Sequence, residues 1–563
     1  MSWQYRMLVV FAAALAVLAF IDSPVFAADM EKTHEEVFTM QEFVSAWHPG
    51  WNLGNTFDAT GSETSWGNPP TTKELIDYIA AAGFRSIRIP VTWGHRMGPA
   101  PDYQISPGFL DRIEEVVQWA LEAGLYVMLN MHHDSLWIGK MAQDPTVLPK
   151  FTAAWEQISA RFRDYPHRLI FEGLNEPRFS DDWNEDRPQY FQFVDELNTT
   201  FHRIVRASGG LNETRPLVLS TLTGSSAQPR LNELAKTIAK LNDDRIIATV
   251  HYYGYWPFSV NIAGSTRFDR QAQNDVDASL NRAYSTFAAK GIPVIIGEYG
   301  LLGFDKHYNT IQRGEIYKYF EYVTYYARSK GMPLMIWDNG QHLDRTTLEW
   351  HDPTLAKLAT AAARSSTANH DTIYLRAGRE LADKSITLNL NGNELEGVEL
   401  NGQKLDPQTD YSLSGSTLTF KRELLERIIT YEYGINAILT LKFSQGVDWE
   451  QKVVYYDRPV LFDSIGTAGH FIIPAKFNGD QLATMEAVYV SGGNAGPQSW
   501  TAFKEFGHCF QPKYDTGVIV ITPEFFNETR DGTIRLKFHF WSGEIVEYSI
   551  VKSGFTISGT AQH

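Results

Sequence analysis

The chain has 563 residues, more than one hydrophobic core usually organises, so we expect several domains. Hydrophobic residues make up 43% of it and charged residues 21%, which is the composition of a soluble globular protein and excludes a largely disordered one. The formal net charge of −16 argues against nucleic acid or an anionic membrane as a partner.

The N-terminal segment has the pattern of a secretory signal. Arg6 precedes an apolar run from Met7 to Phe20, and Val25-Phe26-Ala27 resembles a cleavage site. The apolar run has 14 residues, whereas a membrane-spanning helix needs roughly 20. We therefore expect residues 1–27 to be a signal peptide cleaved near Ala27, and the mature protein to be extracellular.

Between residues 48 and 367, short apolar runs rich in β-branched residues alternate with longer segments of helical period. This alternation is typical of parallel strand–helix units, and eight strands are the number that a closed barrel needs. The sequence thus predicts an α/β fold, a (β/α)8 TIM barrel, over residues 28–368. The predicted strands are Gly50–Asn55, Ser86–Val91, Tyr126–Met131, Leu169–Leu174, Leu217–Thr221, Ile246–Val250, Val294–Gly297 and Leu334–Trp337.

Glycine ends several of the predicted helices, at Gly83, Gly124, Gly291 and Gly331. Glycine readily adopts the left-handed conformation that closes a helix before a short return to the next strand. The connections on the opposite side, from strand to helix, are longer and hold most of the Trp, Asn, Asp and His residues. In a barrel these connections surround the C-terminal mouth, so we expect the chemistry there.

Polar and aromatic residues that are costly to bury end or follow the predicted strands. They are Arg88, His132, His133, Asn175, Glu176, His251, Tyr253, Glu298 and Trp337. Because the strand ends surround one mouth, these side chains can converge on a single ligand. Cleavage of a glycosidic bond needs one carboxyl group to protonate the leaving oxygen and another to attack the anomeric carbon or activate water. Glu176 and Glu298 are therefore the predicted catalytic pair.

Seven strings between Gly50 and Gly340 carry a resemblance to a known family. They are Gly50-Trp-Asn-Leu-Gly-Asn-Thr, Ile87-Arg-Ile-Pro-Val-Thr-Trp, Asn130-Met-His-His-Asp, Leu174-Asn-Glu-Pro, His251-Tyr-Tyr, Ile296-Gly-Glu-Tyr-Gly and Ile336-Trp-Asp-Asn-Gly. In this order they resemble glycoside hydrolase family 5, in the clan of retaining (β/α)8 glycosidases. The resemblance implies that Glu176 is the general acid/base and Glu298 the nucleophile.

The resemblance also implies roles for the residues around this pair. Asn175 would hold the sugar 2-hydroxyl group, and Arg88 and Tyr253 would orient and polarise the nucleophile. Trp337 would stack under the sugar on the non-reducing side of the bond. The remaining expected substrate contacts are Asn52, His132, His133 and His251.

The paired histidines allow a second interpretation, a metallohydrolase. His132 and His133 are adjacent, however, so on a strand their side chains start toward opposite faces. Neither an HExxH spacing nor a cysteine partner accompanies them. We therefore expect no metal and no cofactor.

Four tryptophans fall in the predicted strand-to-helix loops, where aromatic rings suit the apolar faces of consecutive sugars. We expect Trp66 and Trp137 to contact the substrate, and the sequence leaves Trp183 and Trp256 open. Trp119 and Trp155 lie in helical segments and are expected to pack against the barrel.

After residue 368 the helical periodicity largely disappears. Residues 369–456 show the short alternating strands of a β-sandwich and resemble the immunoglobulin-like modules that follow bacterial cellulase domains. Residues 457–563 are again β-rich and resemble a carbohydrate-binding module of family 46. We therefore expect the barrel to be followed by two small all-β domains.

Trp500 follows Ser491-Gly-Gly-Asn-Ala-Gly-Pro-Gln-Ser, a stretch that predicts an exposed loop. Its ring either fills the core of a small domain or binds sugar, and we favour binding that extends the cleft. Cys509 is the only cysteine, so no intrachain disulfide can form, and we expect it to be buried and inert.

Together these features predict a retaining endo-β-1,4-glucanase acting on plant cell-wall β-glucan: cellulose-type polymers, mixed-linkage β-glucan and xyloglucan. No nucleic acid, membrane or obligate protein partner is expected. A mannanase or xylanase on the same barrel would keep both glutamates and differ only in loop contacts. A catalytically silent glycan-binding protein is the alternative from another class, and it would have no use for two close carboxylates.

Overall fold

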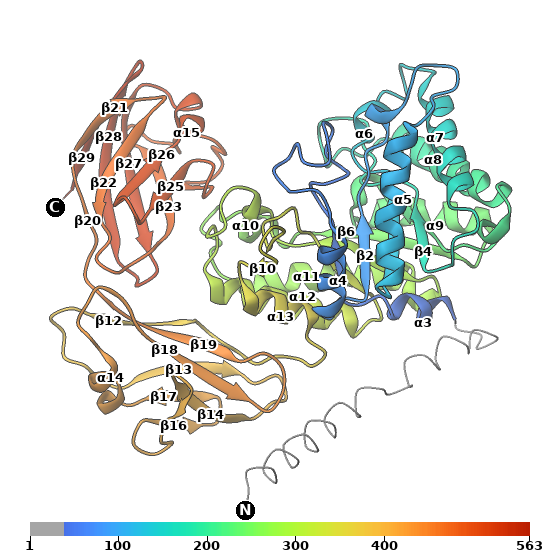
Figure 1. Cartoon of the computed structure of the whole chain (residues 1–563). Helices are drawn as coiled ribbons and strands as arrows, with labels where there is room; N and C mark the ends of the chain where they lie inside the picture. The colour runs from blue at the N-terminus through green and yellow to red at the C-terminus, as the bar shows by residue number, and fades with distance from the viewer. Residues whose placement is uncertain (1–38, 563) are drawn as a thin grey trace, which may run out of the picture.

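The computed structural model describes residues 39–562, which form a barrel domain and two β domains. In Figure 1 the barrel (blue to yellow) lies on one side, and the two smaller domains lie one above the other beside it. The predicted signal peptide lies outside the described residues. Among the helices of residues 39–562, none is both long and apolar enough to cross a membrane.

Eight parallel strands close into a barrel in the order β1 to β8, which confirms the predicted TIM barrel. Every strand begins at the residue that the sequence predicts, but β6 and β7 continue past the predicted ends and pair His251 with Glu298. The strands are β1 (Gly50–Asn52), β2 (Ser86–Ile89), β3 (Tyr126–Asn130), β4 (Leu169–Glu172), β5 (Leu217–Ser220), β6 (Ile246–Tyr252), β7 (Val294–Tyr299) and β8 (Leu334–Ile336).

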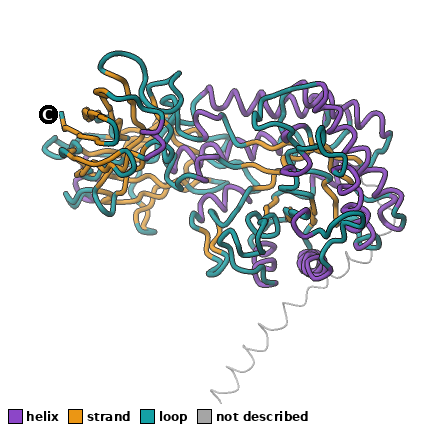
Figure 2. The backbone as a smooth tube through the Cα atoms, turned by 90° about the horizontal axis from the view of Figure 1, so that it is seen from above, coloured by secondary structure: helices purple, strands orange, loops and turns teal. Residues whose placement is uncertain are grey.

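Seen from above, helices surround the barrel strands, whereas the other half of the molecule is almost entirely strand and loop (Figure 2). The helices of the outer layer are α4 (Lys73–Ala81), α5 (Pro107–Glu122), α7 (Val147–Arg161), α8 (Pro188–Ala207), α9 (Gln228–Leu241), α11 (Arg270–Thr286), α12 (Arg313–Arg328) and α13 (Pro353–Thr360). Their boundaries follow local signals. Thr72 caps α4 by accepting a hydrogen bond from the Leu75 amide, and Gly83 and Gly124 have the expected positive φ after α4 and α5.

The N-terminal end of the barrel is closed by α3 (Met40–Ser45). Val44 and Trp47 are buried against the lower ends of the strands, where they pack on residues such as Met128 and Ile295. Only the C-terminal end of the barrel is therefore left for a ligand. The short helices α6 (Ser135–Ile138) and α10 (Trp256–Ser259) lie in the loops of that end.

The second domain is a sandwich of two sheets around its own core, as the sequence predicts. Its first sheet contains β11 (Thr367–Ala368), β13 (Lys384–Asn389), β17 (Thr417–Phe420) and β16 (Tyr411–Ser414). Its second contains β12 (Thr372–Arg376), β19 (Trp449–Tyr456), β18 (Gly434–Phe443), β14 (Leu395–Leu400) and β15 (Gln403–Lys404), and α14 (Arg422–Ile428) lies beside them. Because β11 pairs with β13, the strands of this domain begin at Thr367.

The third domain is also built from two antiparallel sheets with a separate core. One contains β20 (Val460–Leu461), β22 (Phe471–Lys476), β26 (Val518–Ile521) and β25 (Phe510–Lys513). The other contains β21 (Ser464–Thr467), β29 (Thr556–Ala561), β28 (Ile545–Ser553), β27 (Gly532–Phe540), β23 (Leu482–Tyr489) and β24 (Phe503–Lys504). The short helix α15 (Pro523–Asn527) completes it. Cys509 is fully buried in this core, as expected, and burial raises the pKa of its thiol to about 12.

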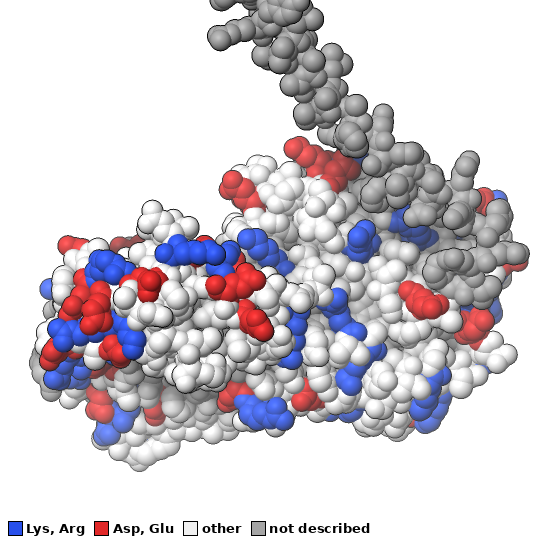
Figure 3. Space-filling view, turned by 90° about the horizontal axis from the view of Figure 1, so that it is seen from below, with Lys and Arg blue, Asp and Glu red and all other residues white. Residues whose placement is uncertain are grey.

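Polar contacts join the three domains. Asn261, in the loop after α10, is 1% exposed and donates from its side-chain amide to the carbonyl of Ala483 in the third domain at 2.9 Å. Its own carbonyl accepts from the Phe506 amide at 3.1 Å. Arg376 of the second domain forms a 2.8 Å ion pair with Glu544 of the third. Seen from below, acidic and basic side chains are interspersed over the visible face (Figure 3).

Candidate active site

Glu298 lies at the C-terminal end of β7, and both of its carboxylate oxygens are held by hydrogen bonds. Arg88 donates from Nη1 to one oxygen at 2.6 Å, and the Tyr253 hydroxyl donates to the other at 2.6 Å. Burial by itself raises the pKa of Glu298, but the charges of His251 and Arg88 and the Tyr253 hydrogen bond outweigh it, so the pKa lies below its usual range. The carboxylate is therefore ionised at neutral pH.

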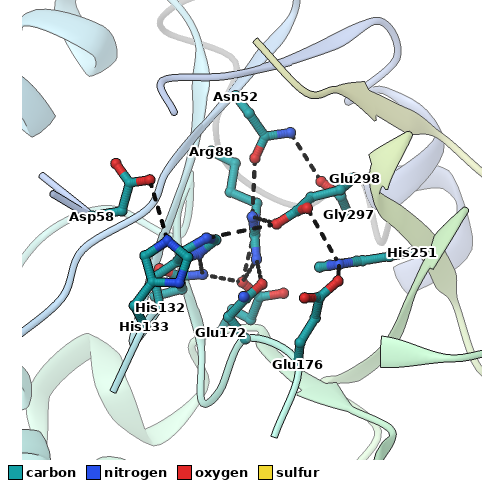
Figure 4. A network of polar contacts seen from close by, with 12 residues as sticks. Asn52, Asp58, Arg88, His132, His133, Glu172, Glu176, His251, Gly297 and Glu298 are labelled. Carbon is teal, nitrogen blue, oxygen red and sulfur yellow. Dashed lines mark hydrogen bonds and ion pairs between the residues drawn. The ribbon is translucent and has the colours of Figure 1, made fainter. Parts of the chain in front are cut away.

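Arg88 is fully buried and organises the centre of the barrel mouth (Figure 4). Besides Glu298, its guanidinium donates to Glu172 at 2.8 Å, to Asn52 at 3.0 Å and to Asn175 at 2.7 Å. One cation thus orients two carboxylates and two amides that come from other strands or their ends. The geometry agrees with the expectation that Arg88 positions Glu298.

Glu172 is a member of this network that the sequence interpretation missed. It is the last residue of β4 and is fully buried, and it also accepts a hydrogen bond from the Asn130 amide at 2.8 Å. A signal was present, because an acidic residue closes the otherwise apolar run Leu169-Ile-Phe-Glu. A charge in such a strand needs a partner in the fold, and here the partner is Arg88.

Asn52 requires a correction. The sequence interpretation assigned it to substrate binding, but it is fully buried, and its amide nitrogen donates to the Gly297 carbonyl at 3.0 Å while its oxygen accepts from Arg88. At the end of β1 its side-chain amide also donates to the carbonyls of Met335 and Ile336 in β8, both at 3.2 Å. The structure therefore places Asn52 where it orients Arg88, and it shows no surface of Asn52 that a sugar could contact.

Glu176 lies beyond the end of β4. Its carboxylate forms a hydrogen bond of 2.7 Å with Nδ1 of His251. Its side chain is 21% exposed, whereas that of Glu298 is 6% exposed. One carboxylate oxygen of each glutamate lies within 4.8 Å of the other and of His251. Burial lowers the pKa of His251, but the charges of Glu298 and Glu176 outweigh it and raise the pKa above its usual value.

His132 and His133 lie side by side, contrary to the expectation that their side chains start toward opposite faces. The ring centroids of His132 and His133 lie 4.5 Å apart, and both rings lie at the barrel mouth. The reason is that β3 ends at Asn130, so strand alternation no longer applies to the two residues. With Asp58 they form a group whose ligand atoms lie within 4.8 Å of one another, so adjacency is no reason to dismiss a metal.

His132 is nevertheless held in place by other contacts. Its ring stacks on Trp337 with centroids 5.6 Å apart and an interplanar angle of 4°. Burial and then the charge of His133 hold the pKa of His132 well below its usual range, so the imidazole is neutral. The structure thus brings His132, His133 and Trp337 into the same part of the mouth.

The loop tryptophans lie around the mouth as exposed or partly exposed rings. Trp66 is 40% exposed and lies 5.3 Å from the His133 ring. Trp137 donates from its indole to Asp134 at 2.7 Å, and Asp134 also accepts from the backbone amides of Trp93 and Gly94. Asp134, which the sequence interpretation missed, therefore fixes the Trp137 ring. As expected, Trp155 is buried in a helix against the barrel.

Trp500 is not a core residue. It is 62% exposed, and its ring lies 6.4 Å from that of Trp256, which belongs to α10 of the barrel. Trp256 is itself 43% exposed. The third domain thus presents an aromatic ring beside a ring from a loop of the barrel mouth, and these two residues are far apart in the sequence.

Residues 52–343 match the family model described as cellulase (glycosyl hydrolase family 5). A protein named endoglucanase B from Paenibacillus lautus is 53% identical over 529 residues, which cover 93% of this chain and 94% of the relative. The chain belongs to glycoside hydrolase family 5. This glycoside hydrolase also carries two domains matched by carbohydrate-binding models, X2 over residues 367–453 and family 46 over residues 457–560.

Solved structures support the same family over all three domains. The full-length tri-modular endo-β-1,4-glucanase B from Bacillus halodurans is 51% identical with a TM-score of 0.93, and covers 94% of this family 5 chain with 100% of its own. A tri-modular subfamily 4 endo-β-1,4-glucanase from Bacillus licheniformis is 30% identical with a TM-score of 0.80, over 93% of this chain and 100% of its own. The three-domain order is therefore shared with known members of the family.

Proposed function

We propose that this chain is a secreted retaining endo-β-1,4-glucanase, with Glu298 as nucleophile and Glu176 as general acid/base. One observation carries the mechanism: oxygens of the two carboxylates lie within 4.8 Å of each other. Retaining glycosidases hold the two carboxyl groups roughly 5–5.5 Å apart, whereas inverting enzymes need roughly 6.5–9.5 Å to admit a water molecule. The short separation supports a double displacement.

The surroundings of the two glutamates suit the two roles. Glu298 is ionised and held from both sides, as attack on the anomeric carbon requires. Glu176 is more exposed and contacts only His251 among the groups described above, so it can donate a proton to the leaving oxygen and later accept one from water. Displacement of Glu298 from the sugar by that water completes the reaction.

The proposed substrate is a β-1,4-linked glucan, because the relatives that match over most of the chain are named endoglucanases. We include cellulose-type polymers, mixed-linkage β-glucan and xyloglucan. A mannanase or xylanase would use the same two glutamates, so comparing initial rates on barley β-glucan, xyloglucan, mannan and xylan decides between them. Export is proposed from the signal pattern of residues 1–27.

The test of the nucleophile is chemical rescue. Glu298→Ala removes the covalent step but leaves the aromatic surface, so it should lose nearly all turnover and still bind oligosaccharide. Azide added with an activated β-glycoside should give the inverted α-glycosyl azide. Normal polymer turnover by Glu298→Ala would contradict the assignment.

The test of the acid/base is the corresponding variant Glu176→Ala. It should still cleave substrates whose leaving group departs without a proton, and should fail on polymer, whose leaving group is a sugar hydroxyl. Equal losses on both substrates would count against the acid/base role. Dialysis against a chelator distinguishes this mechanism from that of a metallohydrolase. The carboxylate mechanism predicts unchanged activity, whereas a metallohydrolase would lose activity.

We further propose that Trp500 and Trp256 together extend the substrate-binding surface beyond the barrel mouth. An exposed ring that stacks on a sugar contributes on the order of 1 kcal/mol. Only a substrate long enough to reach the third domain gains this contact. Trp500→Ala should therefore lower kcat/KM on xyloglucan or β-glucan several-fold, relative to a short chromogenic cellobioside. A parallel fall on both substrates would refute the extension.

A further inference from the structure

The loop that presents Trp500 is glycine-rich, and Asn494 holds one side of it by donating to the Ser499 carbonyl at 2.8 Å. Residues 491–499 contain three glycines, Gly492, Gly493 and Gly496, all at positive φ, and Gln498 also has a positive φ of 51°. Such a segment has many alternative conformations when nothing restrains it. The turn is nevertheless tight, because the Thr501 amide donates to the Gln498 carbonyl at 3.1 Å.

A single buried cation lies beneath this turn. Lys504, the last residue of β24, is fully buried. Its ammonium group donates to the carbonyl of Pro497 at 2.9 Å, of Thr501 at 2.8 Å and of Gln498 at 3.4 Å. The three N–H donors of the lysine thus meet three carbonyl oxygens that flank Trp500 on both sides.

The ammonium is bound by backbone dipoles and not by an ion pair. Within residues 39–562, no carboxylate oxygen lies within 4.0 Å of the Lys504 nitrogen. Burial lowers the pKa of Lys504 to about 8, so at neutral pH the amine still carries its three donors. Burying this charge costs free energy, and the three hydrogen bonds to the carbonyl groups offset that cost. They form only while the turn keeps its shape, so the buried ammonium favours that shape.

The chain that leaves β24 after Lys504 leads to the joint with the barrel, where the Phe506 amide donates to the Asn261 carbonyl. Lys504 pairs with Met485 of β23, and Ala483 of the same strand accepts the hydrogen bond from Asn261. The turn that carries Trp500 is therefore tied, through Lys504, to the strands that dock on the barrel. The Trp500 ring itself is exposed and lies beside Trp256.

We propose that Lys504 is a positioning residue that holds the Trp500 turn in the shape that keeps this ring beside Trp256, and so determines the preference of the enzyme for long glucan chains. The inference rests on the proposed function of Trp500. It assigns a role to a fully buried residue whose hydrogen bonds all go to the Trp500 turn.

The test compares Lys504→Met with a matched control in the same domain, Lys537→Met, whose ammonium pairs with Glu547 on the surface at 3.3 Å. Methionine keeps the length of the side chain and removes all three donors. Lys504→Met should lower the ratio of kcat/KM on xyloglucan to kcat/KM on a chromogenic cellobioside several-fold. Lys537→Met should leave that ratio unchanged.

A double-mutant cycle shows whether Lys504 acts through Trp500. In a Trp500→Ala background, Lys504→Met should cause no further loss of the ratio. Amide hydrogen exchange of peptides covering 490–504 should rise in Lys504→Met while the remaining strands of the domain keep their protection. Lys504→Gln, which retains two donors, should give intermediate values for both quantities.

The outcomes separate the two proposals. An unchanged ratio in Trp500→Ala itself means that the Trp500 function is wrong. A reduced ratio in Trp500→Ala together with an unchanged ratio in Lys504→Met overturns the role of Lys504 alone. Loss of exchange protection across the whole third domain in both Lys504 variants also overturns it, because Lys504 would then support the fold in general.

Discussion

The charge state of Glu298 depends on residues contributed by other strands. Arg88 comes from β2, and His251 and Tyr253 come from β6 and the residue after it. Arg88 also neutralises Glu172, so one buried guanidinium serves two buried carboxylates. Removing one partner of such a network leaves an unpaired buried charge, at a cost of about 3–5 kcal/mol. A substitution that removes only a hydroxyl is therefore the better probe.

We predict that Tyr253→Phe moves the acidic limb of the kcat/KM profile to higher pH. The Tyr253 hydrogen bond stabilises the ionised form of Glu298 and so lowers its pKa, and its loss raises that pKa. Because Glu298 must be ionised to act as the proposed nucleophile, activity then begins to fall at a higher pH as the solution is acidified. Loss of one hydrogen bond to a charged group, about 1.5 kcal/mol, should also lower the maximal kcat/KM roughly tenfold.

The neighbouring Tyr252 provides the control for this prediction. Its hydroxyl also donates to a carboxylate, that of Asp275 at 2.8 Å, but on the outer side of the barrel. Tyr252→Phe should therefore leave the pH profile in place, even where it lowers the melting temperature. An unshifted acidic limb in Tyr253→Phe would mean that this hydrogen bond does not set the charge of the nucleophile.

At the scale of the elements, the loops after β4 and β5 fix Glu176, the proposed acid/base. Glu176 has a φ of 31°, which is unusual for a residue with a side chain, and the amide of Thr223 donates to the Pro177 carbonyl beside it at 2.8 Å. Gly224 follows at a φ of 65°, and a Cβ atom there would lie 3.1 Å from Cγ of Glu176 and 3.3 Å from the His251 ring. The backbone thus leaves no room behind the carboxylate.

We predict that Gly224→Ala lowers activity on polymer by an order of magnitude, because the added methyl group displaces Glu176 or His251. The left-handed backbone adds a cost of about 1 kcal/mol in stability. Steady-state kinetics and thermal melting measure the two effects. The same substitution at Gly291, which has a φ of 81° and no atom within 4 Å of a Cβ, isolates the backbone cost.

Gly291→Ala should therefore lower the melting temperature without changing kcat/KM. Equal kinetic behaviour of the two alanine variants would show that the space beside Glu176 is not limiting.

At the scale of the whole molecule, Asn261 is the polar centre of the joint between the barrel and the third domain. Its amide donates to carbonyl groups on both sides of the joint, Thr310 at 2.7 Å and Ala483 at 2.9 Å. Its φ of 53° is left-handed, a conformation that asparagine tolerates and glycine accepts. The joint holds Trp500 and Trp256 at their observed separation.

We predict that Asn261→Gly loosens the joint, because glycine keeps the backbone conformation but leaves two buried carbonyl groups without a donor. The ratio of kcat/KM on xyloglucan to kcat/KM on a short cellobioside should fall several-fold, and small-angle X-ray scattering should report a broader distribution of domain separations. Asn242→Gly, at a left-handed position with a φ of 49° after α9, is the control. Identical ratios in the two variants would exclude a role of the joint in polymer cleavage.

Much of the barrel was predictable from local patterns. The eight strands start where the apolar runs start, and Gly83, Gly124, Gly291 and Gly331 adopt the expected left-handed conformation. Glu176 and Glu298 stood out because a carboxylic acid at the end of an apolar strand requires a reason to be there. The catalytic roles of the two glutamates stay predictions, but the structure brings them within reach of each other.

The sequence by itself determined the periodicity of the elements, the barrel and the residues at its mouth, because these follow from neighbours along the chain. Only the tertiary structure decided that Asn52 is buried behind Arg88, that Glu172 shares the guanidinium, that His132 and His133 lie side by side, and that Trp500 meets Trp256. Burial and ion pairing depend on which segments pack together over long separations. Periodicity contains no information about those distances, so such contacts appear only when the three domains are assembled.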